Sequence, residues 1–393
     1  MDKRSAKSDR DRPSDPRCRN AKAIWRVDFS LALFNQSGKY QIGKEIIDRH
    51  RALIDSVWYW RWRSADVPHG LAARLIGRAE KLEHDWALRR NNAAPVSRSG
   101  EYRWLHLDPL TVCHRRPVER DVVLVHDLGP LTNPELFPPG IGAAYDLAFR
   151  IVKESGAHIV CVSEDTRLKF IEHFGTPRSS EVIYPPITPR LTEGELTRPQ
   201  DVGERFILTV GAFGARKNQA QCIRAFALSG LHEEGVEYVL CGSREPGFEQ
   251  VLAEADATPG VRILSFVSDA ELRWLYANAL GFVLASRLEG FGMPVAEAMA
   301  FGLPPIISRN SVLEEVAGET GLTVSPDNLT EISQAMRRAL SMDIAERNRR
   351  QTQMQSRLAS FSEEAFHDAW RALLAHQDLR APGKTATRNQ ERV

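Results

Sequence analysis

The sequence predicts an α/β protein made of two domains with doubly wound parallel sheets. After about residue 200, short apolar segments alternate with amphipathic helical segments, which is the pattern of a parallel sheet covered by helices. A chain of 393 residues with 42% hydrophobic content can bury enough apolar surface for two such cores. The proline-rich stretch 185–189, followed by polar residues up to Pro199, is the best candidate for a linker between them.

The first predicted domain covers residues 21–190. Ser163, followed by two acidic residues, predicts a helix start directly after a strand. Residues 37–43 are expected to form the loop that leads into the first helix. The expected strands of this domain are 24–29, 121–128 and 158–163.

The second predicted domain covers residues 200–360. Ser268 and Glu271 have the spacing of a capping box at the start of a helix. Residues 330–340 and 361–374 have the apolar spacing of amphipathic helices. The expected strands are 206–210, 238–241, 261–264, 282–285, 305–307 and 322–324.

The two ends of the chain are expected to be disordered tails. Residues 1–20 are almost all charged, Ser or Pro, so they cannot bury enough apolar surface to offset the entropy lost on ordering. Residues 381–393 have a comparable composition.

The most unusual segment has tryptophan at alternate positions, in Val57–Arg63. Arg-rich sequence follows it, through Arg74, Arg78 and Lys81. The period of two favours a strand whose Trp face lies on the core. Contact of these aromatic and cationic residues with a membrane interface is the alternative.

Composition limits the partners and the compartment. With 52 Lys and Arg against 51 Asp and Glu, the net charge is +1, which argues against nucleic acid as a partner. The five cysteines are widely spaced and include no C-x-x-C pair, so we expect neither a disulfide framework nor a zinc site. No apolar run reaches about 18 residues. These features predict a cytoplasmic protein and leave open peripheral contact with the inner face of a membrane.

Residues 281–300 carry the most informative pattern. An apolar strand segment, 281–286, leads into a turn and then into the Ala- and Met-rich helical run 293–300. Pro294 suits the first helical position, and glycines in the turn allow the backbone to approach a ligand closely. Unpaired amides at this helix start would face the ligand. Taken singly, Glu289 is better explained as an exposed loop acid and Glu297 as a partner of the helix dipole.

The complete string changes that interpretation. Glu-Gly-Phe-Gly-Met-Pro-x-x-Glu-Ala-Met-Ala-x-Gly-x-Pro, from Glu289 to Pro304, resembles the signature of the retaining nucleotide-sugar glycosyltransferases of family 4. The resemblance implies the GT-B fold, in which two Rossmann-like domains face each other across a cleft and a C-terminal helix, here 361–380, crosses back to the first domain. It also implies that Glu289 contacts the donor sugar and Glu297 the nucleotide ribose. Donor binding is further assigned to Gly290, Phe291 and Gly292.

A second segment of the same half, Val210–Asn218, resembles the glycine-rich strand end followed by Arg-Lys-Asn of this family. We expect Gly211 and Gly214 to bind the donor, and Arg216 and Lys217 to neutralise its leaving diphosphate. A dinucleotide fingerprint is excluded because no G-x-G-x-x-G is present.

No metal is expected at this site, and no other cofactor. The Asp-x-Asp motif of another glycosyltransferase class occurs only as Asp9-Arg10-Asp11. That triplet lies in the charged tail and not at a strand end, where the motif functions. The positive charge of Arg216 and Lys217 replaces the metal in this interpretation.

The first half matches the family less well. His126 and Asp127 follow a strand and are expected at the carboxyl edge of the sheet, where ligands gather. Relatives have a similar His-Asp, and His126 is assigned a catalytic role, with a structural core role as the alternative. Gly43, in Gln41-Ile42-Gly43, corresponds imperfectly to a Gly-Ile-Gly of the family near the donor phosphates.

Together these features predict a retaining glycosyltransferase. It would move a sugar from a nucleotide-diphosphate donor, with GDP-mannose preferred, to a saccharide or lipid-linked acceptor in cell-surface polysaccharide synthesis. The alternatives are another enzyme of the same fold, namely a nucleotide-sugar epimerase or a sugar-phosphate synthase, and an inactive sugar-nucleotide-binding protein.

Overall fold

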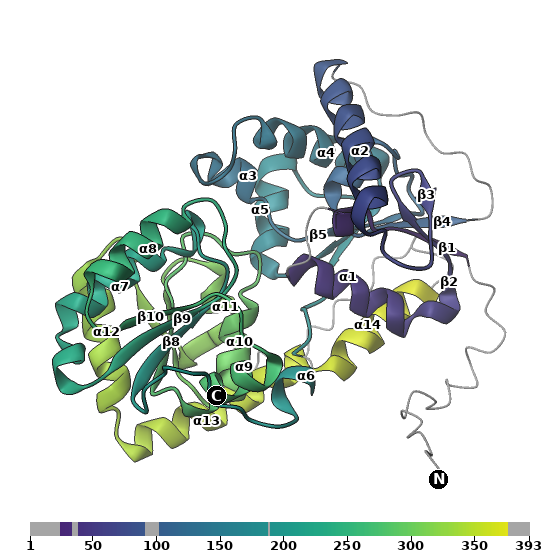
Figure 1. Cartoon of the computed structure of the whole chain (residues 1–393). Helices are drawn as coiled ribbons and strands as arrows, with labels where there is room; N and C mark the ends of the chain where they lie inside the picture. Colours follow the sequence, from purple (N-terminus) through teal and green to yellow (C-terminus); the bar gives the residue numbers. More distant parts are fainter. Residues whose placement is uncertain (1–23, 34–37, 91–101, 188, 376–393) are drawn as a thin grey trace, which may run out of the picture.

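The computed structural model describes residues 24–33, 38–90, 102–187 and 189–375. It contains two parallel sheets, each covered by helices, in two halves that lie side by side (Figure 1). Both predicted tails lie outside the described residues. The two-domain α/β architecture predicted from the sequence is confirmed.

The first sheet has seven strands in the order β3-β2-β1-β4-β5-β6-β7. All neighbours pair in parallel except β2 and β3, which form an antiparallel hairpin. Strand Val122–Val125 is buried along its whole length and entirely apolar, as expected for a parallel strand covered on both faces. The strands are β1 Trp25–Asp28, β2 Ile54–Tyr59, β3 Trp62–Arg63, β4 Arg103–His106, β5 Val122–Val125, β6 His158–Cys161 and β7 Ser180–Val182.

The helices of this half differ in how they begin. Helix α5 has the predicted cap, because the Ser163 side chain accepts a hydrogen bond from the Thr166 amide. The α-helices are α1 Gly38–Arg49, α2 Gly70–Arg90, α3 Gly129–Thr132, α4 Ile141–Ser155, α5 Glu164–Phe174 and α6 Pro189–Thr192. The 3-10 helices are Ser30–Leu33, Arg51–Leu53, Pro109–Cys113 and Pro134–Leu136.

The second sheet has six parallel strands in the order β10-β9-β8-β11-β12-β13. All six strands predicted for this half are present, with ends that agree within one residue. They are β8 Phe206–Val210, β9 Glu237–Cys241, β10 Val261–Leu264, β11 Gly281–Leu284, β12 Pro305–Ser308 and β13 Leu322–Val324. Residues 183–205, which include the predicted linker, separate the two sheets in the chain.

One helix of the second half, Asp269–Asn278, begins with the predicted capping box. The Ser268 side chain accepts a hydrogen bond from the Glu271 amide, and the Glu271 side chain accepts one from the Ser268 amide. The α-helices are α7 Gln219–Ser229, α8 Phe248–Ala257, α9 Asp269–Asn278, α10 Met293–Ala300, α11 Val312–Ala317, α12 Leu329–Ser341, α13 Ile344–Leu358 and α14 Glu363–Ala375. The 3-10 helices are Ala215–Lys217, Leu231–Glu234, Gly318–Thr320 and Ala359–Phe361.

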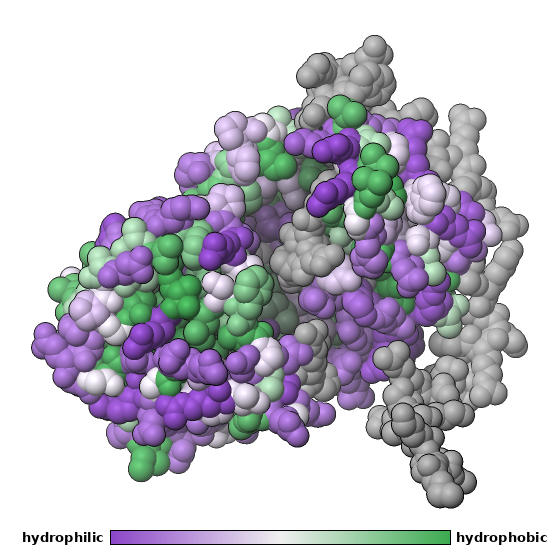
Figure 2. Space-filling model, viewed as in Figure 1, coloured by the Kyte–Doolittle hydropathy of each residue, from purple (hydrophilic) through white to green (hydrophobic). Residues whose placement is uncertain are grey.

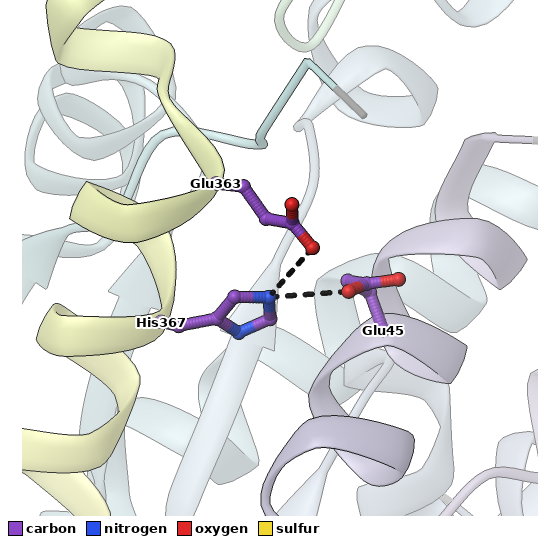
Figure 3. A group of neighbouring side chains, drawn as sticks. All are labelled: Glu45, Glu363 and His367. Atoms are coloured by element: carbon purple, nitrogen blue, oxygen red, sulfur yellow. Dashed lines mark hydrogen bonds and ion pairs between the residues drawn. The ribbon is translucent and has the colours of Figure 1, made fainter. Parts of the chain in front are cut away.

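Helix α14 leaves the second half and packs on the first, beside α1 (Figure 1). The Trp25 indole N–H donates to the Leu374 carbonyl at 2.8 Å, which ties α14 to the first strand of the chain. Figure 3 shows His367 of α14 between two carboxylates, with its Nε2 3.1 Å from Glu45 of α1 and 3.6 Å from Glu363. The hydrogen bond from His367 lowers the pKa of the Glu45 carboxyl.

An apolar cluster continues from one half into the other. Phe291, at the start of the second half's central turn, packs against Tyr184 from the connection and Phe361 ahead of α14, with ring centroids 5.9 and 5.2 Å apart. Tyr184 and Phe361 also meet edge to face. These aromatic contacts join the second half to the connection and to the segment ahead of α14.

Three local predictions were wrong. Residues 38–43 belong to helix α1 and not to a loop. The Trp segment forms strand β2, but Val57 and Tyr59 are the buried residues, whereas Trp62 is 59% exposed. Trp60 has a positive φ of 57° at the hairpin turn, which ends the alternation. Helix α10 begins at Met293, so Pro294 is its second residue.

Candidate active site

The strand order of each sheet contains one switch point, between β1 and β4 in the first sheet and between β8 and β11 in the second. In the second sheet the chain starts at β8, moves outward to β9 and β10, and then returns to the other side of β8 as β11. Ligands of open α/β sheets bind at such a switch point. The two segments singled out from the sequence follow these two strands, so the fold brings them together.

The loop after β8 positions two cations. Gly211 has φ of 147°, which an L-residue adopts only with strain. Arg216 makes a two-pronged ion pair with Glu245, its Nε and terminal nitrogen lying 3.1 and 3.0 Å from the two carboxylate oxygens. The Arg216 carbonyl also accepts the amide of Arg287 at 2.8 Å, so the backbone joins this loop to the turn after β11.

Lys217 and Glu289 form the central ion pair of the site. Both side chains are only 7% exposed, and the Lys217 ammonium donates to the carboxylate of Glu289. The Ser286 hydroxyl donates to the same carboxylate at 2.8 Å, and Arg216 lies 3.9 Å from its other oxygen. Burial lowers the pKa of the Lys217 ammonium, although Glu289 acts in the opposite direction.

The start of α10 lies in the same turn. Gly292 is the N-cap residue with φ of 97°, and a Cβ there would lie 2.3 Å from a Leu313 methyl. Glycine is therefore required for both backbone and space. Inside the helix, Glu297 accepts a hydrogen bond from the Tyr276 hydroxyl at 2.7 Å. Burial raises the pKa of the Glu297 carboxyl, with Tyr276 and Lys217 opposing it.

In the first half, a single lysine from helix α1 lies between two carboxylates near the carboxyl edge of the sheet. The Nζ of Lys39, at the start of α1, is 3.2 Å from Asp127 and 3.9 Å from Asp108. Burial disfavours the charged lysine, but Asp127, Tyr145 and Asp108 outweigh it and raise its pKa above the usual value. Burial raises the pKa of Asp108. The pKa of Asp127 is lowered, because Lys39 outweighs the effect of burial.

His126 directly follows β5 and is only 4% exposed. Its Nε2 lies 2.9 Å from the Leu107 carbonyl, so this nitrogen carries the proton and Nδ1 is left as an acceptor. Burial, reinforced by Lys39, lowers the pKa of the imidazole to about 3. His126 is therefore neutral near pH 7. It stands at the predicted edge of the sheet, but most of its side chain is enclosed.

The two halves meet at His126 and Gly290. A Cβ on Gly290 would lie 2.1 Å from the His126 carbonyl oxygen, so no other residue fits without separating the halves. The Ser163 hydroxyl donates to the Gly290 carbonyl at 2.8 Å. The carboxylate of Glu315 accepts the amides of Glu164 and Asp165, at 2.7 and 2.9 Å. An acidic side chain of the second half thus caps helix α5 of the first.

Three of the predicted donor residues have other structural partners. Gly43 is buried in α1, where a Cβ would lie 2.5 Å from the Phe29 ring, so close helix packing explains the glycine. Phe291 packs at the joint between the halves. Gly214 lines a hollow of about 170 Å³ between α7 and α8, of which Lys217 and Glu289 are not lining residues. Donor contact by these three residues stays a prediction.

Among the described residues, one group of three side chains is close enough to hold a metal ion: Glu45, Glu363 and His367 (Figure 3). It joins α1 to α14, whereas the predicted site residues other than Gly43 follow β5, β8 and β11. The existing hydrogen bond and ion pairs account for its geometry.

Sequence reasoning did not assign Lys39, Glu245 or Tyr276 to the site. Lys39 comes from a helix start that was expected to be a loop. Glu245 follows β9 by four residues, and this strand-end position was a usable signal. Tyr276 lies in α9, and its contact with Glu297 depends on tertiary packing that local patterns do not reveal.

Comparison with known proteins agrees with this architecture. Residues 197–357 match the family model of the glycosyl transferases group 1. The chain is 30% identical over 239 residues to O-antigen chain mannosyltransferase B of Escherichia coli, with 58% of this chain and 62% of that protein covered. It is 34% identical over 131 residues to GDP-mannose:cellobiosyl-diphosphopolyprenol alpha-mannosyltransferase of Komagataeibacter xylinus, with 32% and 33% covered. The chain thus spans less than two thirds of either relative.

A solved structure extends the likeness to the first half. Anabaena HepE, in complex with UDP and glucose, aligns with a TM-score of 0.61 and 16% identity over 89% of this chain and 99% of that one. At this identity the alignment establishes the fold alone. The family model covers the half that carries Arg216, Lys217, Glu289 and Glu297, and the fold match covers both halves. The chain has the GT-B fold, and residues 197–357 of its second half are similar to the glycosyl transferases group 1.

Proposed function

We propose that this chain transfers a hexose from a nucleotide-diphosphate sugar to a hydroxyl of a saccharide or lipid-linked acceptor, with retention of configuration. The observation that carries the proposal is the Lys217–Glu289 pair, together with Arg216, at the switch point between β8 and β11. Cations and a sugar-facing carboxylate at one strand edge suit a substrate with both phosphates and hydroxyls.

The donor diphosphate would lie over the start of α10, beside Arg216 and Lys217. Amides of the first helical turn and the helix dipole favour an anion there. Both cations are already paired with carboxylates, Arg216 with Glu245 and Lys217 with Glu289. The diphosphate would therefore share the cations with these carboxylates, which in turn hold the cations in place.

Glu289 would bind hydroxyls of the donor sugar and Glu297 would bind the ribose. Lys217 and Ser286 fix the orientation of the Glu289 carboxylate. Burial and the Tyr276 hydrogen bond fix that of Glu297. The membership of these residues in the long signature supports both roles.

The acceptor would approach from the first half, where His126, Asp127 and Lys39 lie. In the transfer step the bond between the sugar anomeric carbon and the departing phosphate oxygen breaks, and the acceptor oxygen forms the new bond on the same face. The acceptor proton passes to a donor phosphate oxygen. Arg216 and Lys217 stabilise the charge that develops on the diphosphate, so no metal is needed.

We favour mannose as the transferred sugar and a cell-surface polysaccharide as the product. Both curated relatives described above are named as mannosyltransferases, one of them for the O-antigen chain and the other with GDP-mannose in its name. We also propose a cytoplasmic location, supported by the four described cysteines, all of which are free and buried. Family 4 is the subdivision that the Glu289–Pro304 signature favours.

Product analysis tests the proposal. Purified protein is incubated with UDP-, GDP- or ADP-sugars, each with and without a polyprenyl-diphosphate saccharide acceptor. We expect a glycosylated acceptor and free nucleoside diphosphate, with the anomeric configuration of the donor retained in the product. Conversion of the donor sugar without an acceptor would establish the epimerase instead, and transfer to a sugar phosphate would establish the synthase.

A thermal-shift panel separates a binding protein from an enzyme. A nucleotide sugar at about a hundred times its dissociation constant should stabilise the fold by about 2.7 kcal/mol. Stabilisation without turnover on any acceptor would favour the inactive binding protein. The variant Glu297→Gln is compared in the same panel. Because it loses the ribose contact, its melting temperature should rise less with the matching donor than that of the unchanged protein.

A further inference from the structure

Helix α2 carries an exposed apolar stripe outside the site described above. Leu71, Leu75 and Leu82 are 73, 57 and 69% exposed. Leu75 lies four positions and Leu82 eleven positions after Leu71, and this spacing places all three on one side of the helix. The opposite side packs on the molecule, where Gly77 and Glu80 are buried. We call the exposed stripe and its cationic flank the α2 face.

Cations flank the stripe on one side. Arg74, Arg78 and Lys81 are all exposed and occupy the positions next to the leucines around the helix. The described acidic side chains of α2 do not oppose them. Glu80 is buried, and Glu83 is paired with Arg61 at 2.6 Å.

The β2–β3 hairpin extends the α2 face. Glu83 accepts hydrogen bonds from both the Trp60 indole and Arg61, which holds the hairpin against α2. Trp62 at the hairpin is 59% exposed, and Arg63 beside it is exposed as well. Two acidic residues lie close to Trp62 in the chain: Asp55 of β2, which is paired with Arg26 at 3.6 Å, and Asp66, which is exposed.

Exposed large apolar side chains are concentrated in this region. Of the ten found among the described residues, four lie on the α2 face or the hairpin, within residues 62–82. Figure 2 shows strongly apolar surface beside strongly hydrophilic surface over the part of the molecule where Figure 1 draws α2. An exposed apolar patch rimmed by charge marks an interaction surface, whereas scattered leucines need no explanation.

We propose that the α2 face and Trp62 dock on the surface of an anionic phospholipid bilayer. Leucine and tryptophan side chains suit the boundary between headgroups and acyl chains, and cations beside them attract anionic headgroups. The charge argues for this partner, because five exposed cations accompany the four apolar side chains: Arg63, Arg74, Arg78 and Lys81, together with Arg61, which is paired with Glu83. The proposed contact is peripheral. No described helix is long and apolar enough to span a membrane.

This docking does not depend on the sugar that is transferred. It would hold the first half, with Lys39 and Asp127, at the membrane surface and leave the second half projecting from it. An acceptor carried on a lipid would then reach the site by diffusion in two dimensions. Failure of the proposed transfer reaction would leave the docking proposal untouched.

Vesicle flotation of the full chain tests the proposal. Vesicles of phosphatidylcholine are compared with vesicles in which part of it is replaced by phosphatidylglycerol. We expect binding to the anionic vesicles that weakens as salt rises, because exposed charges are screened beyond about 8 to 10 Å near physiological ionic strength.

Two triple variants separate the apolar and electrostatic contributions. Leu71→Ser with Leu75→Ser and Leu82→Ser should weaken vesicle binding by at least about tenfold, because three side chains lose their place in the interface. Arg74→Gln with Arg78→Gln and Lys81→Gln should weaken it by a comparable factor on anionic vesicles only.

Matched controls change the same number of side chains on the second half. Leu228→Ser with Leu252→Ser and Ile344→Ser is the apolar control, and Arg337→Gln with Arg338→Gln and Arg349→Gln is the charge control. Both should bind like the unchanged protein, and melting curves should confirm that all four variants fold.

Three outcomes would overturn the proposal. The first is absence of binding to anionic vesicles, and the second is binding that neither α2 triple variant weakens. The third is a dimer that the leucine variant dissociates, measured by analytical ultracentrifugation, since it would assign the α2 face to a second copy of the chain.

Discussion

The two halves of the candidate site handle charge in opposite ways. On the second half, Arg216 and Lys217 are each paired with one carboxylate, Glu245 and Glu289. On the first half, Lys39 alone lies between Asp108 and Asp127. One side thus offers two cations that a diphosphate can share, whereas the other presents carboxylates around a single cation. The difference fits a phosphate-bearing donor on the second half and a hydroxyl-bearing acceptor on the first.

The second half should show the largest effect on activity. Arg216→Ala or Lys217→Ala should each remove about 2 to 4 kcal/mol of transition-state stabilisation, the usual loss for one preorganised charge-stabilising group. The measurement is kcat/KM for the donor. The matched control is Arg224→Ala on helix α7, which breaks an ion pair with Glu254 of α8 and should leave kcat/KM unchanged. Equal, small effects in all three variants would remove the contrast between the halves.

On the first half, His126→Ala should lower kcat by about tenfold to a thousandfold if the imidazole orients the reacting sugar. The neutral ring, with its Nε2 held by Leu107, is suited to such positioning. A melting curve accompanies the kinetics. Loss of cooperative unfolding, with no active fraction left to assay, would instead assign His126 to the core.

Within the second half, Glu289→Gln and Glu297→Gln should affect different kinetic constants. Glu289, next to the sugar, should mainly lower kcat, while Glu297, on the ribose, should mainly raise the KM for the donor. We expect about tenfold changes, the scale of one hydrogen bond to a charged group. Identical effects on both constants in both variants would contradict the separate roles.

A buried histidine of the first half, His106, should make the folded protein less stable at acid pH. Burial lowers the pKa of His106 from 6.5 to about 3, although Asp28 opposes this. The unfolded chain therefore binds a proton first as the pH falls below 6.5, and stability is lost between pH 6.5 and 3. His106→Gln should make the free energy of unfolding depend less steeply on pH in this window. The total loss of unfolding free energy across the window should shrink by about 1.4 kcal/mol for each unit of pKa shift that the substitution removes. Parallel curves for the two proteins would show that His106 does not titrate in this way.

The sequence was more informative for the second half than for the first. All six strands there were predicted, and the site residues that the sequence identified come from two continuous segments, 210–218 and 288–300. Local glycines and a helix start define each segment, so the chemistry could be read without knowing the fold. The ion pairs among these residues could not be predicted, because they depend on the order β9-β8-β11 in the sheet.

In the first half the site is assembled from separate segments. Lys39, Asp108 and Asp127 follow different elements and meet through sheet topology. The Trp segment shows a second limit. Its alternation correctly predicted a strand, but which face is buried depends on the hairpin turn at Trp60 and on Glu83 of α2. Period alone does not distinguish the buried face of a strand from an exposed one.

The central claim is that side chains and a helix start, and not a metal ion, stabilise the leaving diphosphate. The direct test is transferase activity after exhaustive treatment with EDTA, measured on the unchanged protein and on a variant lacking residues 1–20, which removes the Asp-x-Asp triplet. We expect both to keep full activity, because Arg216 and Lys217 supply the positive charge. Activity that EDTA abolishes and magnesium or manganese restores would contradict the claim.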